Sequence, residues 1–184
     1  IILLTSNVSS AKNIKEAYFA GGCFWCMEEF FEQVKGVEEV ITGYSGGDVE
    51  NPTYKEVTYG NTGHFEVAKI IYDEDITNYK DLLNLYWQNI DPFDFAGQFC
   101  DKGSSYRSVA FYKTQNENDE IKNSITNIEK QFKGKKVVTF IRKFEKFYPA
   151  EDYHQDYYQE NFMNYLLYKK ACGREQTLKN IWDN

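Results

Sequence analysis

The sequence predicts an α+β fold in which helices pack on a mixed sheet in two layers. Segments with the hydrophobic spacing of strands and helices follow one another in the order β-α-β-β-α-β, with a further α-β pair behind them. A length of 184 residues suits one domain with a sizeable core. An aromatic content of 17% is far too high for a disordered chain.

In the first half, glycines and turn residues separate the apolar runs. A strand is expected over residues 15–20, and it runs into two glycines and then a helix over 23–34 that Gly36 ends. Apolar side chains recur in this helix at the spacing of a buried face. The other elements of this half are a strand over 37–44, a tight loop at 45–48, a turn at 51–54 and a strand over 63–73.

In the second half, Asn78 can cap a helix that Asp91 and Pro92 end. Isoleucines at helical spacing mark a third helix, which ends before Gly134. From Pro149 onward the chain is rich in tyrosine, and we expect it to wrap around the domain as helical pieces with a mobile end. The elements between these are a loop over 92–105 and strands over 106–113 and 137–142.

These elements divide the chain into three parts: an N-terminal tail over 1–14, a central α/β domain over 15–148 and a C-terminal extension over 149–184. The apolar start at residues 1–4, followed by polar and small residues, resembles the end of a signal peptide. Two locations are therefore expected, the cytoplasm and, as the alternative, export to the periplasm.

The charge of the chain excludes two classes of partner. With 21 basic and 28 acidic residues the net charge is −7, and no cluster of Lys and Arg is available to bind nucleic acid. No apolar run approaches the ~20 residues that a membrane span needs. Four cysteines are too few for a disulfide-rich secreted scaffold. These features are typical of a soluble enzyme or binding domain.

The segment GGCFWC at 21–26 is the first candidate for chemistry. Cys23 follows two glycines at a strand-to-helix junction, where unpaired backbone N–H groups favour a thiolate and lower the thiol pKa. The alternative is a small buried hydrophobic residue. Cys26, three residues on, could form a disulfide with it. Zinc is not expected, because His64 and His154 stand far apart and no second cysteine pair is present.

The second candidate is Glu66, in a strand that is largely apolar on both faces. A carboxyl group in such a strand is desolvated, and desolvation raises its pKa toward the range of a useful proton donor. The alternative is an ion-paired strand glutamate. His64, two residues earlier, is as much a packing residue as a catalytic candidate. Tyr54 and Tyr106 lie in loops where their hydroxyls could hold a polar oxygen, but most of the 15 tyrosines must serve the core or the surface.

Six motifs, in order over residues 16–158, resemble those of the class A peptide methionine sulfoxide reductases. This sequence departs from that pattern at Cys26, where glycine is commonest, and at Ser105, where glutamine is usual. The resemblance implies a ferredoxin-like α/β plait with a long coiled C-terminal extension. The motifs are GCFW at 22–25, TGYSGG at 42–47, NPTY at 51–54, TGHFE at 62–66, Asp101 with YRS at 106–108, and AEDYHQ at 150–155.

The resemblance also implies the roles of the site residues. The reaction would be thiol-dependent reduction of methionine S-sulfoxide, free or in proteins, through a sulfenic acid and then a disulfide that thioredoxin reduces. It implies no metal and no organic cofactor, and a monomer. The residues are Cys23 as nucleophile, Phe24 and Trp25 as a cup for the substrate methyl, Glu66 as proton donor with Tyr54 and Tyr106 as hydrogen-bond partners, and Asp101 and His154 as shaping residues.

Two cysteines could resolve the sulfenic acid. Cys172 is favoured, because a mobile extension with neighbouring cations could carry its thiolate to Cys23 and then outward to a reductant. Cys26 is the alternative, since it is near but held in a fixed direction on the next helical turn. A different function is a disulfide relay or peptide-binding domain built on Cys23 and Cys26, which would not depend on Glu66.

Overall fold

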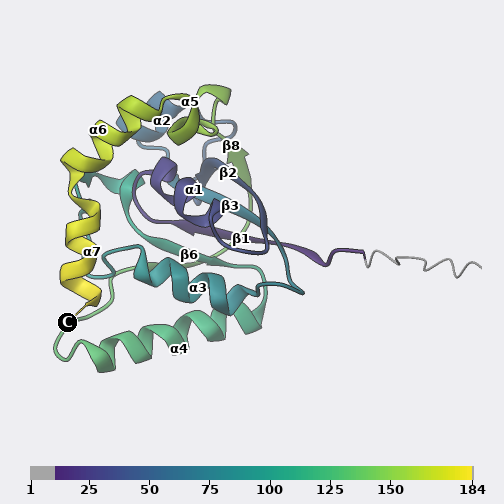
Figure 1. Cartoon of the computed structure of the whole chain (residues 1–184), viewed down its shortest axis with the longest axis vertical. Helices are drawn as coiled ribbons and strands as arrows, with labels where there is room; N and C mark the ends of the chain where they lie inside the picture. The colour runs from purple at the N-terminus through teal and green to yellow at the C-terminus, as the bar shows by residue number, and fades with distance from the viewer. Residues whose placement is uncertain (1–10, 184) are drawn as a thin grey trace, which may run out of the picture.

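The computed structural model describes residues 11–183, which form a mixed sheet of six strands covered by helices (Figure 1). The order across the sheet is β7-β6-β1-β3-β2-β8, and all neighbours are antiparallel except β6 and β7, which are parallel. A separate two-stranded ribbon pairs β4 with β5. The strands are β1 (Ile14–Ala20), β2 (Val37–Ser45), β3 (Phe65–Asp73), β4 (Gly97–Gln98), β5 (Asp101–Lys102), β6 (Val109–Tyr112), β7 (Phe140–Lys143) and β8 (Phe147–Pro149).

The helices begin at polar caps that the sequence provides. The Asn78 side chain accepts a hydrogen bond from the backbone of Asp81, and Thr114 forms a capping box with Glu117. No helix among the described residues is long and apolar enough to cross a membrane. The helices are α1 (Phe24–Glu32), α2 (Tyr54–Tyr59), α3 (Tyr79–Gln88), α4 (Gln115–Gln131), α5 (Tyr157–Glu160), α6 (Phe162–Cys172) and α7 (Arg174–Trp182).

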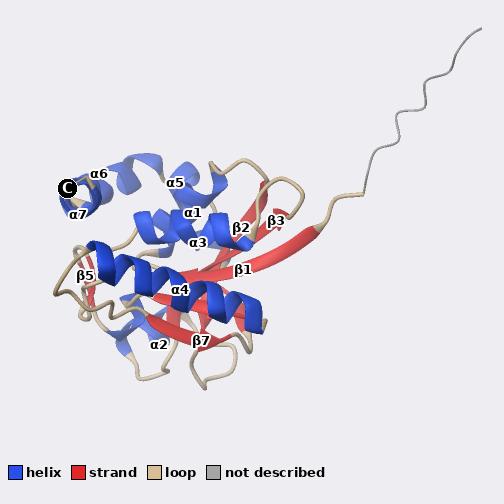
Figure 2. Ribbon diagram, turned by 90° about the horizontal axis from the view of Figure 1, so that it is seen from below, coloured by secondary structure: helices blue, strands red, loops and turns tan. Residues whose placement is uncertain are grey.

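The main core lies between one face of the sheet and helices α1, α3 and α4 (Figure 2). Phe19 of β1 stacks on Phe31 of α1 and on Tyr86 of α3, with ring centroids 5.9 and 4.7 Å away. Each large side chain buried here contributes about 1.5–3 kcal/mol relative to exposure. This packing fixes the start of α1 over the end of β1.

The sheet is curled. β7 and β8 lie at its opposite edges, yet only residues 144–146 join them. Such a link reaches roughly 14 Å, whereas the edges of a flat sheet of six strands lie about 24 Å apart. Phe144 from this link stacks on Tyr18 across the concave face, at 3.8 Å between ring centroids. The two edges therefore approach each other around a second, smaller core.

The predicted α+β class with helices on a mixed sheet is confirmed, and the sheet is curled, which the sequence did not predict. The sequence missed α2, which continues from the predicted turn, and β8. The extension is helical as predicted, but its last helix is docked rather than mobile: the Trp182 indole donates to the carbonyl of Ile90 at 3.2 Å and packs on Phe132. The signal-peptide prediction for the first residues falls on 1–10, outside the described residues.

Candidate active site

Cys23 is the N-cap of α1, at the junction that the sequence predicted between β1 and this helix. Two glycines make the junction possible. Gly22 has a φ of +83°, and a Cβ there would lie 2.6 Å from a side-chain carbon of Gln98; a Cβ on Gly21 would lie 2.6 Å from the sulfur of Met27. The chain can therefore turn and pack tightly only with glycine at both positions, which places the thiol at the start of the helix.

A small cavity of about 90 Å³ opens at this junction. It has the volume of about three water molecules, which suits the tip of a side chain. Its lining combines aromatic rings with one thiol and two carboxyl groups. The lining residues are Cys23, Phe24, Trp25, Tyr54, Glu66, Asp101, Tyr106 and Tyr168.

Glu66 lies in β3, a central strand, and is 2% exposed. Its Oε2 accepts a hydrogen bond from the backbone N–H of Phe24, 3.1 Å away. Burial raises the pKa of Glu66 to about 8. The predicted poorly hydrated environment is confirmed, and the carboxyl group holds a proton at neutral pH.

Two tyrosines complete the polar side of the cavity. The side chains of Tyr54 and Tyr106 line the cavity together with the Glu66 carboxyl. Burial raises the pKa of both phenols, so both keep their protons. The backbone of Tyr54 is held in place because its N–H donates to a Glu151 carboxylate oxygen at 2.8 Å. Three proton-bearing oxygens therefore converge on one wall.

The two thiols, Cys23 and Cys26, are both free and buried, and they pack in the same cluster. The neighbouring Cys23 side chain and the charge of Arg174 lower the pKa of Cys26 to about 7, against burial. Burial, the Cys26 thiolate and Glu66 raise the pKa of Cys23. The predicted lowered pKa of Cys23 is thus wrong: the adjacent thiol ionises first, and its charge hinders the second ionisation.

Trp25 and His154 form a supporting pair. The indole N–H of Trp25 donates to Nδ1 of His154 at 3.2 Å, and its ring stacks on Tyr157 at 3.8 Å. Burial lowers the pKa of His154, so the imidazole stays neutral and can accept this bond. His154 does not line the cavity; it orients the indole that does. His64 is bonded to the loop through the Gly47 N–H and the Val49 carbonyl, which is a structural role.

Sequence reasoning missed two tyrosines that α6 brings to the site. The Tyr168 hydroxyl donates a hydrogen bond to Asp101, and its side chain lines the cavity with Cys23. Tyr165 packs in one buried cluster with Cys23 and Cys26, and its hydroxyl donates to a Glu29 carboxylate oxygen at 2.7 Å. Burial raises the pKa of Asp101, which lies at the cavity wall. The tyrosine-rich composition after residue 149 was the only signal in the sequence, and it does not distinguish these two from their neighbours.

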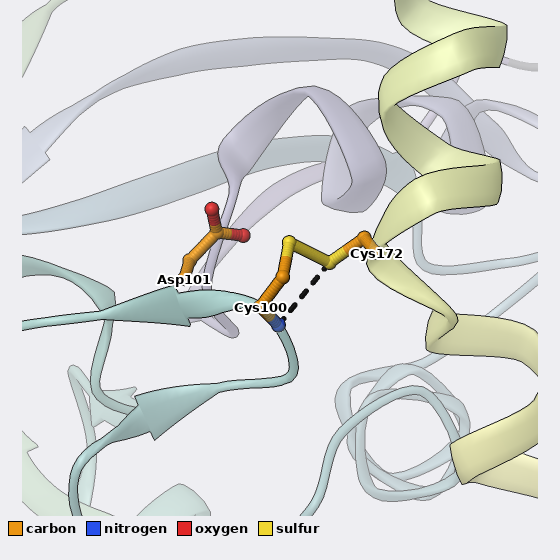
Figure 3. Close-up of side chains that lie close together, drawn as sticks. All are labelled: Cys100, Asp101 and Cys172. Atoms are coloured by element: carbon orange, nitrogen blue, oxygen red, sulfur yellow. Dashed lines mark hydrogen bonds between the residues drawn. A yellow bond between two sulfur atoms is a disulfide. The ribbon is translucent and has the colours of Figure 1, made fainter.

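Cys172, which the sequence favoured as the partner of Cys23, is in a disulfide with Cys100 (Figure 3). The backbone N–H of Cys100 also donates to the Cys172 sulfur at 3.2 Å. Because Cys100 directly precedes Asp101, this disulfide joins the end of α6 to the strand that carries a cavity residue. The structure therefore brings Cys26, not Cys172, next to Cys23.

Comparison with known proteins agrees with this geometry. The family model "Peptide methionine sulfoxide reductase" matches residues 15–184. The chain is 45% identical over 172 residues to peptide methionine sulfoxide reductase MsrA of Listeria monocytogenes, covering 93% of this chain and 97% of that protein. It is 44% identical over 175 residues to MsrA/MsrB of Vibrio cholerae, covering 95% of this chain but only 46% of that protein, so it spans about half of that relative. The reduced form of Mxr1 from Saccharomyces cerevisiae matches with a TM-score of 0.75 at 28% identity, over 83% of this chain and 88% of Mxr1.

Proposed function

Because this chain belongs to the peptide methionine sulfoxide reductase family, we propose that it reduces methionine S-sulfoxide, free or in proteins, to methionine, and so repairs oxidised proteins. One observation carries this proposal: a buried thiol and a proton-bearing carboxyl group line the same small cavity. Attack of a thiolate on a sulfoxide is slow until the oxygen receives a proton, so the reaction needs both groups in one dry pocket.

In the proposed reaction the substrate methyl packs against Phe24 and Trp25, and its oxygen meets Glu66, Tyr106 and Tyr54. Cys23 gives its proton to solvent before the substrate fills the cavity, which places the negative charge on the attacking sulfur. Cys23 then attacks the sulfoxide sulfur while Glu66 protonates the oxygen. This attack forms a bond between the two sulfurs and leaves a hydroxyl on the substrate sulfur. The hydroxyl then passes to the Cys23 sulfur as the S–O bond and the S–S bond break, the electron pair of the S–S bond stays on the methionine sulfur, and methionine leaves behind a sulfenic acid on Cys23.

We expect the enzyme to consume one epimer of methionine sulfoxide. The aromatic rings of Phe24 and Trp25 hold the methyl on one side of the cavity, and the hydroxyls around Glu66 hold the oxygen on the other, so one configuration at sulfur faces Cys23. By family resemblance this is the S epimer. Racemic substrate, dithiothreitol and chiral chromatography provide the test, with half of the substrate left unreacted. Equal consumption of both epimers would contradict the proposed binding of the methyl group and the oxygen on opposite sides of the cavity.

We further propose that Cys26 resolves the sulfenic acid, with Cys172 as the second candidate. Support comes from the packing of Cys26 in one buried cluster with Cys23 and from the lowered pKa of Cys26, whereas Cys172 is already bonded to Cys100. The Cys26 thiolate attacks the Cys23 sulfur, the S–S bond forms, and the hydroxyl group leaves as water after taking up a proton.

The resolving thiol can be identified by mapping disulfides after one equivalent of sulfoxide without reductant. We expect a Cys23–Cys26 link in the wild type and in Cys172→Ser. In Cys26→Ser we expect methionine release to persist, while the sulfenic acid accumulates as an adduct with dimedone. A Cys23–Cys172 link in the wild type would assign the role to Cys172 instead.

The reductant we propose is thioredoxin. Mxr1 is recorded in a crystal structure in complex with Trx2, and a disulfide formed at Cys23 must be reduced by an external dithiol before the next turnover. Thioredoxin with its reductase and NADPH should therefore replace dithiothreitol in the assay.

Several further proposals concern architecture. The order β6-β1-β3-β2, with helices α1 and α3 in the connections, supports a ferredoxin-like plait within the curled sheet. We propose a catalytic domain over 15–148, an N-terminal tail over 1–14 and an extension over 149–184.

We also propose that the protein is a monomer, to be checked by light scattering. A cytoplasmic location, with periplasmic export as the alternative, is to be checked by cell fractionation.

A further inference from the structure

A buried arginine lies behind the two thiols. Arg174, the first residue of α7, is 4% exposed. Its guanidinium donates to the carbonyl of Gly21 at 3.3 Å and to the carbonyl of Asn89 at 2.6 Å, and approaches the sulfur of Met27 at 3.5 Å. Since Gly21 precedes the Cys23 loop and Met27 follows Cys26, the positive charge lies against both ends of the thiol-bearing segment.

This cation has no ionic partner within the described part of the chain: neither of its two hydrogen-bonded acceptors carries a charge, and no carboxylate forms a salt bridge with it. Its Nε is buried without a hydrogen-bond partner, and its far face packs on the ring of Phe99 at 4.5 Å. Burying an unpaired charge is costly, so a fold that keeps it needs a negative charge nearby. Arg174 acts on the ionisation of Cys26, Asp101 and Tyr86, and of these Tyr86 is kept protonated because burial raises its pKa.

We propose that Arg174 is a positioning residue that holds Cys26 as a thiolate for attack on the sulfenic acid of Cys23. The inference rests on the proposed function, because it assigns Arg174 to the resolving step of that reaction. The guanidinium neither contacts the cavity nor lines it. It acts through Cys26, whose negative charge it stabilises in a place that water does not reach.

Other ionisable groups face Cys26 and either oppose or assist the stabilisation of its thiolate. The neighbouring Cys23 and Tyr165 side chains also favour the thiolate of Cys26. The carboxyl of Asp101 opposes it, and that of Glu66 does so only where it is ionised, above about pH 8. Among the largest influences on Cys26 from the described residues, Arg174 is the cation. The groups that face it are Cys23 at the start of α1, Glu66 in β3, Asp101 in β5, Tyr165 and Tyr168 in α6, and Arg174 in α7.

The position of Arg174 is fixed by its neighbours. Gly173, with a φ of +68°, makes the corner between α6 and α7. One residue earlier, Cys172 is linked to Cys100, and Figure 3 shows this link at the lower end of α6, beside Asp101. The corner is therefore anchored on both sides, by the disulfide and by the two carbonyls that the guanidinium binds.

The test separates the two halves of one turnover. The wild type and the variants Arg174→Gln and Arg174→Lys receive one equivalent of methionine S-sulfoxide without reductant. Methionine release is followed by rapid quench, and Cys23–Cys26 disulfide formation by loss of free thiols, both between pH 5.5 and 9.5. Lys170→Gln, which removes an exposed cation of the same extension, is the matched control. Thermal unfolding confirms that each variant is folded.

In Arg174→Gln we expect methionine release to stay within about twofold of wild type, whereas disulfide formation slows about fivefold at pH 7. The midpoint of its pH profile should rise by about one unit from near 7, which lowers the thiolate fraction of Cys26 at pH 7 from about one half to about one eleventh. Arg174→Lys should recover most of the rate, and Lys170→Gln should behave as wild type. An unchanged pH profile in folded Arg174→Gln, or equal slowing of both steps, overturns the proposal.

A second measurement does not depend on any arginine variant. Thiolate absorbance near 240 nm in the untreated wild type should show a group titrating near pH 7, and Cys26→Ser should lack it. Absence of such a thiolate in the wild type overturns the role of Arg174, even if sulfoxide is reduced. Conversely, a wild type that shows the thiolate but releases no methionine refutes the proposed function and leaves the charge pairing in place.

Discussion

A Cys23→Ser protein is expected to release no methionine from methionine S-sulfoxide, a loss on the order of 10⁴-fold or more. Serine keeps the N-cap geometry and the size of the side chain, so the fold of the α1 start should persist. What disappears is the sulfur that attacks and then carries the oxygen. The measurement is methionine release with dithiothreitol, scored by mass spectrometry of a sulfoxide-bearing peptide.

The matched control is Cys100→Ser, which removes a sulfur outside the cavity and should keep most of the wild-type rate. Cys100 contacts the cavity only through its neighbour Asp101, and its disulfide does not enter the reductive step. Activity at the wild-type rate in Cys23→Ser would refute the nucleophile assignment and favour a disulfide relay or peptide-binding domain.

The second large effect is expected in Glu66→Gln, which should slow the reductive step by about 10²–10⁴-fold with little change in substrate affinity. The proton is needed only as the S–O bond breaks, so its loss affects the transition state more than the bound substrate. Single-turnover methionine release at several substrate concentrations separates the two quantities. If Glu66→Gln binds substrate poorly but releases methionine at the wild-type rate, Glu66 is not the proton donor and has a structural role.

The pH dependence of this pair follows from the pKa of Glu66, which burial raises to about 8. Below pH 8 the wild type holds the proton that it donates, and above pH 8 it loses that proton. The difference between wild type and Glu66→Gln should therefore be largest near neutral pH. It should narrow above pH 8, and also in acid, where solvent protons can replace the carboxyl group.

The free energy of unfolding should also depend on pH because of Glu66. Between pH 4.5, the ordinary pKa of Glu66, and about 8, the folded state binds more protons at this residue than the unfolded state. The free energy of unfolding contributed by Glu66 therefore falls as pH rises through this window. Glu66→Gln should be more stable relative to wild type at pH 8 than at pH 5, as measured by denaturant titration.

Much of the site could be predicted because local sequence determines it. The paired glycines before Cys23 specify a strand-to-helix turn, and the apolar strand around Glu66 specifies a buried carboxyl group. The pKa order of the thiols could not be predicted, since it depends on Arg174, which is distant in sequence. Tyr165 and Tyr168 were missed for the same reason: which face of α6 meets α1 is decided by packing between elements far apart in the chain.

In the fold, too, features set by local sequence could be predicted, and features set by contacts between distant segments could not. The cap at Asn78 and apolar periodicity marked the helices, whereas the curl of the sheet follows from the short link over 144–146, which has no signature of its own. β8 was missed because three residues are too few to show an alternating pattern. The disulfide between Cys100 and Cys172 had no local signal either, since only the folded chain brings these residues together.

The contact between Arg174 and Gly21 spans 153 positions of sequence, and this affects how the protein is made on the ribosome. The strands up to β8 can pair as soon as residue 149 has emerged, whereas α6 and α7 leave the exit tunnel afterwards. A nascent chain at that stage holds both thiols and Glu66 but lacks the guanidinium and the tyrosine hydroxyls that serve them. The chain can therefore complete a full catalytic cycle only after α6 and α7 have folded onto the domain. A chain that stalls after β8 would have a formed sheet, but its two thiols would be exposed to oxidants because α6 and α7 do not yet cover them.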